Sequence, residues 1–120
     1  MNKEKLMTLS TNSIVVRPVK KDERDKVRIC IAWSFHKGSL VNGLPEIPGF
    51  IQFEPEEDSF FWAVFVDNEP VSALMLIPFE ISVGITSFHV IGLTGVGTHP
   101  DHQHKGYASM LLKAVHKFAR

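Results

Sequence analysis

The sequence has very little cysteine and tyrosine, and it has no excess of charge of either sign. Cys30 is the only cysteine among 120 residues, which excludes an intramolecular disulfide and a cysteine-rich zinc site. The 13 basic residues balance the 13 acidic residues, so no strong positive field is present to attract nucleic acid. The basic residues near the C-terminal end are not interleaved with aromatic residues that could stack on bases, which also argues against a nucleic-acid partner.

The chain also lacks internal repeats and long hydrophobic runs. No apolar run approaches the length of a membrane span, so we expect no membrane partner. We expect a soluble protein in the cytoplasm, with the nucleus as the alternative location. A length of 120 residues suits one domain and is too short for two. We divide the chain into a polar N-terminal tail, residues 1–13, and one domain, residues 14–120.

Hydrophobic periodicity predicts the element order β-α-β-β-β-α, which is a mixed α/β class with an α+β sheet. The predicted strands are 14–19, 60–66, 71–79 and 88–98, and the predicted helices are 22–35 and 105–119. Asp22 is the predicted N-cap of the first helix. Residues 38–59 are rich in proline and glycine and are predicted to form a long loop, whose acidic run at 54–58 is predicted to be a solvated face.

The strand predicted at 88–98 is unusual because it contains Gly92, Gly95 and Gly97. Glycine weakens a strand, so three glycines predict a β-bulge or a ligand that approaches the backbone closely. The run at 60–66 is apolar throughout, which is typical of a central strand covered on both faces. Asp67-Asn68-Glu69-Pro70 has turn chemistry and predicts a hairpin with the next strand.

The segment between the last predicted strand and the last predicted helix has the chemistry of a phosphate-binding turn. It reads Gln103-His104-Lys105-Gly106-Tyr107-Ala108, with the spacing Q-x-x-G-x-A. The first turn of a helix has unpaired N–H groups and a partial positive charge, which favour phosphate. Gly106 allows close backbone approach, Ala108 leaves the helix start free of bulk, and the three residues before Gly106 add side-chain donors.

This segment resembles the coenzyme A-binding motif of the GCN5-related N-acetyltransferase (GNAT) family, whose pattern is R/Q-x-x-G-x-G/A. The strand that ends in Thr98-His99-Pro100, the amphipathic helix that follows, and the order of the upstream elements also resemble that family over residues 14–120. The resemblance implies a GNAT-like fold, with acetyl-CoA as cosubstrate and a primary amine as acceptor. It also implies that residues 38–59 line the acceptor site.

The resemblance assigns roles to individual residues. Backbone groups of Val96, Gly97 and Thr98 would pair with the pantetheine arm as if it were another strand, and one N–H would polarise the thioester carbonyl. Residues of the turn and of the helix start would hold the pyrophosphate. These are Gln103, His104, Lys105, Gly106, Tyr107, Ala108 and Ser109.

Acetyl transfer to an amine requires a base for the ammonium proton and an acid for the leaving thiolate. Glu80 and His89 are the candidates for the base, although neither belongs to a motif, and a water relay is the alternative. The family's usual acid is a tyrosine located after the motif helix. Tyr107, the single tyrosine, lies in the phosphate turn and is poorly placed for that role.

The family fold continues past the motif helix with a strand, a helix and a final hairpin, whereas this sequence stops at Arg120. We therefore expect the glycine-rich strand to be an exposed edge and apolar surface to remain uncovered. The expectation is a fragment, a truncated product, or a subunit completed by another chain, with a homodimer as one form of completion. The rival function is a non-catalytic acyl-CoA-binding or interaction module that kept the turn and lost the chemistry.

Three other sites are disfavoured by the residues themselves. His99, His102 and His104 lack a helical i, i+4 pair, so we predict no metal site. Gly95-Val96-Gly97 begins like a dinucleotide fingerprint, but the third glycine position is Pro100. Cys30 lies on the apolar face of the first helix and is predicted to be a core residue, not a nucleophile.

Overall fold

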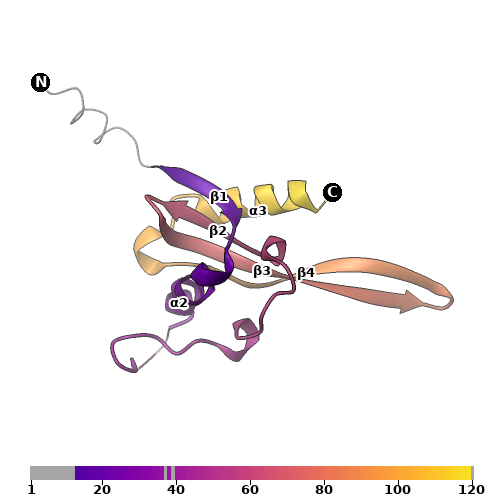
Figure 1. The fold of residues 1–120 in the computed structure, drawn as a ribbon, viewed down its shortest axis with the longest axis horizontal. Coiled ribbons are helices and arrows are strands. Elements are labelled where there is room, and N and C mark those ends of the chain that lie inside the picture. The colour runs from indigo at the N-terminus through magenta and orange to yellow at the C-terminus, as the bar shows by residue number, and fades with distance from the viewer. Residues whose placement is uncertain (1–12, 37, 39, 120) are drawn as a thin grey trace, which may run out of the picture.

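In the computed structural model, which describes residues 13–36, 38 and 40–119, a four-stranded antiparallel sheet lies between two α-helices (Figure 1). The strands lie in the sheet in chain order: β1 (Ile14–Pro18), β2 (Phe61–Val66), β3 (Glu69–Val83) and β4 (Thr86–Thr98). The helices are α2 (Arg24–Ser34) and α3 (Tyr107–Phe118). Short 3₁₀ helices occur at η1 (Lys21–Glu23), η2 (Gly49–Ile51), η3 (Asp58–Phe60) and η4 (Pro100–His102). The predicted class and element order are confirmed, and the predicted tail lies outside the described residues except for Ser13.

Alternating side chains along the strands build one hydrophobic core on each face of the sheet. In β2, Phe61 and Phe65 point toward α2, whereas Val64 points toward α3, as expected for a strand with period two. Helix α2 contributes Val27 and Ile31 to its core. The α3 core also contains Leu111 and Val115 from the helix. The prediction that β2 is covered on both faces is therefore confirmed. No helix in the described part of the chain is long and apolar enough to cross a membrane.

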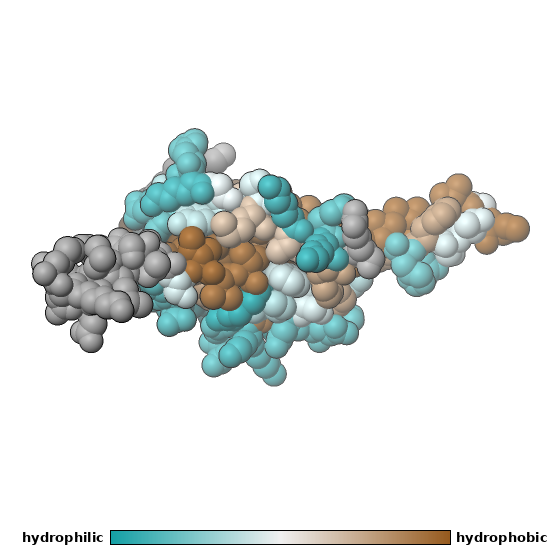
Figure 2. Space-filling view, turned by 90° about the horizontal axis from the view of Figure 1, so that it is seen from above, coloured by the Kyte–Doolittle hydropathy of each residue, from teal (hydrophilic) through white to brown (hydrophobic). Residues whose placement is uncertain are grey.

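Strands β3 and β4 are longer than predicted and form a projecting two-stranded arm, which we define as residues 77–93 (Figure 1). Pairing between β2 and β3 ends at Phe61 and Met75, so beyond this point β3 pairs only with β4. One face of the arm is apolar, with Phe79 and Phe88 exposed by 46% and 52%. Figure 2 shows hydrophobic side chains over the arm. A two-stranded hairpin without further packing is only marginally stable in water. The described residues leave the apolar face of the arm exposed.

The predicted β-bulge lies in β4, where Gly95 and Val96 stand opposite the single residue Leu74. Gly95 has a φ of 63°, in the left-handed region that favours glycine. A Cβ at Gly95 would overlap the Cγ2 of Ile51, and a Cβ at Gly97 would lie 3.0 Å from the Cβ of Ser34. Close packing of neighbouring elements therefore explains both glycines.

The helix boundaries differ from those predicted, for reasons of local backbone geometry. Asp22 is not the N-cap of α2, because the chain first forms η1 and α2 begins at Arg24 after Glu23. Helix α3 begins at Tyr107 and not at Lys105, since His104 and Gly106 have φ values of 66° and 81° that an α-helix cannot include.

The acidic side chains at 54–58, at the end of the long loop, are exposed to solvent, but two of them also form ion pairs with α2. Glu54 and Asp58 bind the guanidinium of Arg24 at 2.8 Å and 2.9 Å, although Arg24 itself is buried. Hydrogen bonding to Arg24 lowers the pKa of Glu54 from its ordinary value. The run therefore ties the loop to α2.

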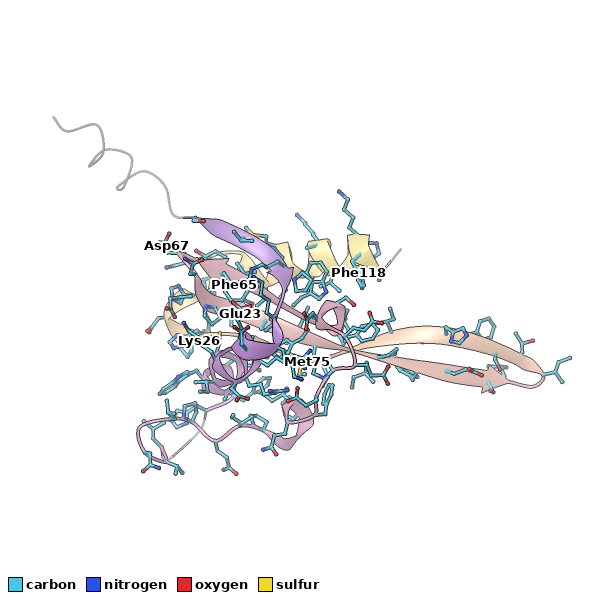
Figure 3. All side chains as sticks on the ribbon, in the orientation of Figure 1. Glu23, Lys26, Phe65, Asp67, Met75 and Phe118 are labelled. Atoms are coloured by element: carbon cyan, nitrogen blue, oxygen red, sulfur yellow. The ribbon has the colours of Figure 1, made fainter. Side chains whose placement is uncertain are left out.

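Glu23 links β1 to the start of α2. The guanidinium of Arg17 donates to both oxygens of Glu23 at 2.8 Å and stacks over the ring of Phe65, 3.9 Å from its centroid (Figure 3). The Glu23 carboxylate also accepts the Lys20 backbone N–H at 3.0 Å. These partners, Arg17 first, lower the pKa of Glu23 from 4.5 to about 2.

We predict that Glu23→Gln destabilises the protein at neutral pH and progressively less as the solution is acidified. A carboxylate with a lowered pKa contributes stability that is complete above its unfolded pKa and is lost as pH falls through its folded pKa. The difference in the free energy of unfolding between wild type and variant should therefore shrink between pH 4.5 and about pH 2. Denaturant titrations at several pH values measure this difference. Asp22→Asn is the control, and an equal pH dependence for both variants would contradict the prediction.

Candidate functional site

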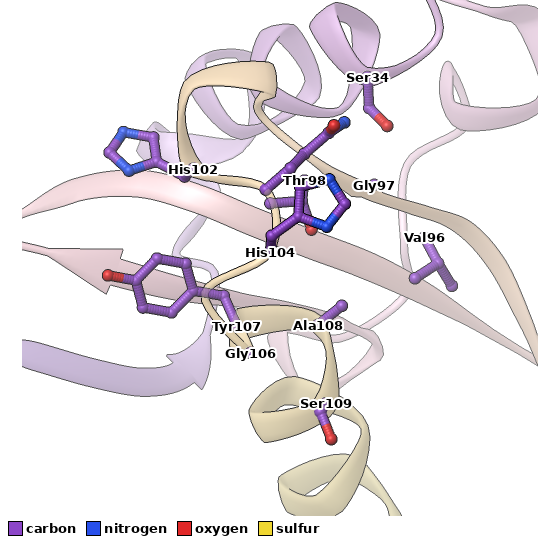
Figure 4. A pocket seen from close by; sticks show the side chains of 11 residues that line it. Ser34, Val96, Gly97, Thr98, His102, His104, Gly106, Tyr107, Ala108 and Ser109 are labelled. Carbon is purple, nitrogen blue, oxygen red and sulfur yellow. The ribbon is translucent and has the colours of Figure 1, made fainter.

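A pocket with a volume of about 320 Å³ lies where β4 ends and α3 begins. All of the predicted cofactor-binding residues except Lys105 line it, and Lys105 is exposed on the adjoining turn. Figure 4 shows the lining side chains coming from three places: the end of β4, the turn that follows, and the first turn of α3. Ser34 reaches the same pocket from α2. The structure thus brings together residues that the sequence analysis had grouped by motif and by resemblance.

The start of α3 is open toward this pocket. Gly106 is the N-cap residue in a left-handed conformation, and no side chain caps the helix. No acidic residue occupies the first turn, and a Cβ at Gly106 would meet no atom within 4 Å. The unpaired N–H groups and the partial positive charge of the helix start are therefore accessible to an anion.

The end of β4 is held in place by β3. The buried hydroxyl of Ser72 donates to the Gly97 carbonyl at 3.1 Å and lies 2.9 Å from the hydroxyl of Thr98. The His99 N–H donates to the Val71 carbonyl at 2.9 Å. Since an antiparallel ladder alternates, the N–H and C=O of Thr98 point toward the opposite edge of β4, which is open among the described strands.

A row of aromatic rings connects the turn to α2. Trp33 lies 5.9 Å from His99, His99 lies 5.9 Å from His102, and His102 lies 6.3 Å from Tyr107, measured between ring centroids. His99 also accepts the Asp101 N–H at 3.1 Å, which closes η4. Within residues 13–36, 38 and 40–119, no cluster of three metal-binding side chains occurs. The histidines therefore shape the turn through packing.

Ser34 and His102 are pocket residues that the sequence analysis did not assign to the site. A signal for Ser34 was present, because it is a polar residue on the apolar stripe of α2 that contains Val27 and Ile31. His102 gave no such signal, since its position depends on η4. Its Nδ1 is buried and has no hydrogen-bond partner among the described residues.

Glu80 and His89, the candidate bases, lie elsewhere. They are cross-strand partners on the arm and line a separate cavity of about 670 Å³ together with Phe60 and Phe79. His89 precedes Val96 by seven residues on β4, which corresponds to about 23 Å of strand. The structure brings the two side chains together, but it does not bring them to the pocket at the end of β4.

A comparison with protein families identifies the class of protein. Residues 15–120 match the family model described as "Acetyltransferase (GNAT) domain". The chain therefore belongs to the GNAT acetyltransferase family, as the motif predicted. A search of curated proteins finds no match.

Solved structures support the fold assignment. The chain is similar to a GCN5-related N-acetyltransferase from Kribbella flavida, with a TM-score of 0.69, 22% identity, and coverage of 93% of this chain and 28% of the other. It is also similar to a conserved protein of unknown function from Enterococcus faecalis V583, described as a "Probable N-Acyltransferase", with a TM-score of 0.65 and 18% identity. That alignment covers 89% of this chain and 26% of the other, so the chain spans about a quarter of the length of both neighbours.

Cys30 lies behind the site and has the properties of a core residue. Its exposed fraction is 4%, and burial raises the pKa of its thiol to about 11, although a backbone group of His99 partly opposes the shift. Since the thiolate is the reactive species, Cys30 is unsuited to act as a nucleophile. The prediction of a structural cysteine is confirmed.

We predict that a thiol reagent leaves Cys30 unmodified in the folded protein and modifies it after unfolding. Burial limits access, and a pKa of about 11 leaves little thiolate at neutral pH. The rate is measured by absorbance against free cysteine, with Cys30→Ala as the control for other absorbance changes. Modification of the folded chain at a rate near that of free cysteine would contradict the placement of Cys30.

Proposed function

We propose that the chain binds acetyl-CoA as its cosubstrate and transfers the acetyl group to a primary amine. The observation that carries the proposal is the uncapped start of α3, which opens into a pocket beside the open edge of β4. A helix start suited to phosphate and a strand edge that line one pocket match the two chemically different parts of acetyl-CoA. The pyrophosphate needs N–H donors and positive charge, whereas the pantetheine amides need backbone partners.

In this proposal the pyrophosphate binds at residues 103–109, with Lys105 and His104 adding donors at the rim. The pantetheine arm pairs with Val96, Gly97 and Thr98 along the open edge of β4. An N–H of this segment polarises the thioester carbonyl and stabilises the oxyanion that forms there. Residues 38–59 contribute to the acceptor site.

The amine must lose a proton before it attacks the thioester carbon. The C–N bond then forms, the C–S bond breaks, and the thiolate takes up a proton. His89 stands about 23 Å along β4 from Val96, and Glu80 is its cross-strand partner on β3, so both are too far for direct proton transfer. We therefore propose that water in the open pocket accepts the ammonium proton.

A non-catalytic acyl-CoA-binding module is the second candidate function. The observation that favours it is that both predicted bases, Glu80 and His89, lie on the arm and outside the pocket. Such a module would bind the same ligand through the same turn. We propose a cytoplasmic location for either function, with the nucleus as the alternative, since the one cysteine is held as a free thiol.

Calorimetry with CoA and acetyl-CoA, followed by a thiol-release assay with a panel of amines, tests the two functions. Binding with thiol release supports the transferase, and binding without release supports the module. Absence of binding contradicts both. The amines should include amino acids, small diamines and peptides with a free N-terminus or lysine, which together sample the classes of primary amine.

Within the same experiment, Gly106→Val should weaken CoA binding by roughly tenfold to 100-fold. A side chain there opposes the left-handed backbone and enters the space that the phosphate would occupy, and one lost charge-assisted hydrogen bond corresponds to about 1.5–3 kcal/mol. Gly84→Val is the matched control, since Gly84 also has a positive φ and open surroundings but lies at the tip of the arm. Equal affinities for the two variants would contradict the proposed site.

We also propose that a second copy of the chain, or another completing chain, covers the apolar face of the arm. The exposed side chains on this face are contributed by both strands and include no charge, so two identical faces could meet without repulsion. They are Ile77, Phe79, Ile81, Val83 and Phe88. The open edge of β4 lies on the same element.

We predict that the purified chain self-associates and that Phe79→Ser combined with Phe88→Ser reduces this association. The substitutions remove the largest apolar side chains from the face that would be buried. Light scattering over a range of concentrations measures the change. Ser82→Ala, on the opposite face of the arm, is the control. A monomer with a sharp, cooperative melt would contradict the proposal that a second chain is needed.

A further inference from the structure

Arg28 is a buried cation whose donors hold the loop between α2 and β2. Its side chain is 5% exposed. The Nε donates to the Ile51 carbonyl at 2.9 Å, and the Nη2 donates to the Phe53 carbonyl at 2.8 Å and to Glu54 at 2.9 Å. The Nη1 contacts Asp25 at 3.1 Å. One guanidinium therefore fixes the backbone of η2 and the residues just after it to helix α2.

Ile51, whose carbonyl accepts a hydrogen bond from Arg28, packs into the space that a side chain at Gly95 would occupy. Ile51 is fully buried, and its Cγ2 occupies the position that a Cβ at Gly95 would need. Gly95 is itself buried and has the left-handed backbone of the bulge. The contact between Ile51 and Gly95 therefore lies at the bulge, where the ladder between β3 and β4 is interrupted.

The bulge determines how β4 enters the pocket. Because Gly95 and Val96 together face Leu74, every residue after them is shifted by one position relative to β3. Val96 is the first of the residues that line the pocket, followed by Gly97 and Thr98. A change in the bulge would move the N–H groups proposed to face the thioester, whereas the turn at residues 103–109 has a separate ring contact, between His102 and Tyr107.

We infer that Arg28 is a positioning residue for acyl transfer, which acts through Ile51 on the bulge at Gly95 and thereby sets the position of the β4 backbone in the pocket. This inference rests on the proposed function. Arg28 lines no part of the pocket, so it is not assigned any contact with the cosubstrate.

Arg24 provides a matched control on the same helix. It is also buried and also binds Glu54, and its second partner is Asp58. Among the described residues its hydrogen bonds go to side chains, and none goes to a backbone carbonyl of the loop. Replacing Arg24 therefore removes a comparable buried ion pair without releasing Ile51.

The experiment compares Arg28→Lys, Arg24→Lys and Ile51→Leu in the full chain. Lysine keeps the charge but cannot reproduce the planar fork, and leucine keeps the apolar volume while removing the methyl that meets Gly95. The measurements are kcat and KM for acetyl-CoA, the Kd for CoA, the melting temperature, and amide hydrogen exchange at Gly95 and Val96.

We expect Arg28→Lys to lower kcat by about tenfold to 100-fold while the Kd for CoA changes by less than about twofold, since misplacement of a reacting group affects the chemical step more than binding. Exchange at Gly95 and Val96 should accelerate by about tenfold. Ile51→Leu should change kcat and exchange in the same direction. Arg24→Lys should lower the melting temperature similarly but leave kcat and the exchange at the bulge near wild type.

Two results would overturn the inference. Equal effects of Arg28→Lys and Arg24→Lys on kcat and on exchange would show that only general stability changed. Unchanged exchange at the bulge in both Arg28→Lys and Ile51→Leu would show that the contact of Arg28 with Ile51 does not hold the bulge. Absence of turnover in the wild type is a different outcome: it contradicts the proposed transferase, and the positioning role of Arg28 in it. The exchange comparison still decides whether the contact of Arg28 with Ile51 holds the bulge.

Discussion

The contact between Ile51 and Gly95 is the constraint on which the site depends. A side chain at Gly95 would exclude Ile51 from its place, and without the left-handed backbone at Gly95 strand β4 would remain in register with β3. The bulge shifts Val96 and the residues after it, and the strand then leads through η4 into the start of α3. One glycine therefore couples the packing of the α2 core to the geometry of the pocket.

Most of the fold, and the turn at residues 103–109 that lines the pocket, could be predicted because their signals are local. The spacing of Gln103, Gly106 and Ala108 and the periodicity of the helices lie within short windows of sequence. The arm was missed although residues 79–83 and 86–90 alternate in the manner of strands, because such alternation normally requires a core on one side. The contact of Arg28 with the loop was missed because its loop partners are 23 to 26 residues away. A charged residue beside Val27 on a buried helix face was the one available sign.

Helices α2 and α3 pack on opposite faces of the sheet and are held there by different contacts. Helix α2 packs through Val27 and Ile31 and is also held by charge, because Arg24 and Arg28 reach into the loop. Its final turn packs against Gly97 through Ser34. Helix α3 is fixed by apolar packing along Leu111 and Val115, and its start is left without a cap. Charged contacts therefore hold one side of the pocket through α2, whereas the uncapped start of α3 leaves the other side open.

Strand β4 forms one of the two strands of the arm, and its last three residues line the pocket. A Cβ at Gly92 would lie 3.0 Å from the ring of Phe79, so this ring packs closely over Gly92. The contact supports β4 between the tip of the arm and the pocket. If covering the arm changes the affinity of the turn for its ligand, linkage requires that the ligand change the affinity of the arm for its cover by the same factor. A single continuous strand would thus connect the proposed assembly at the arm with the proposed binding of the cosubstrate at the turn.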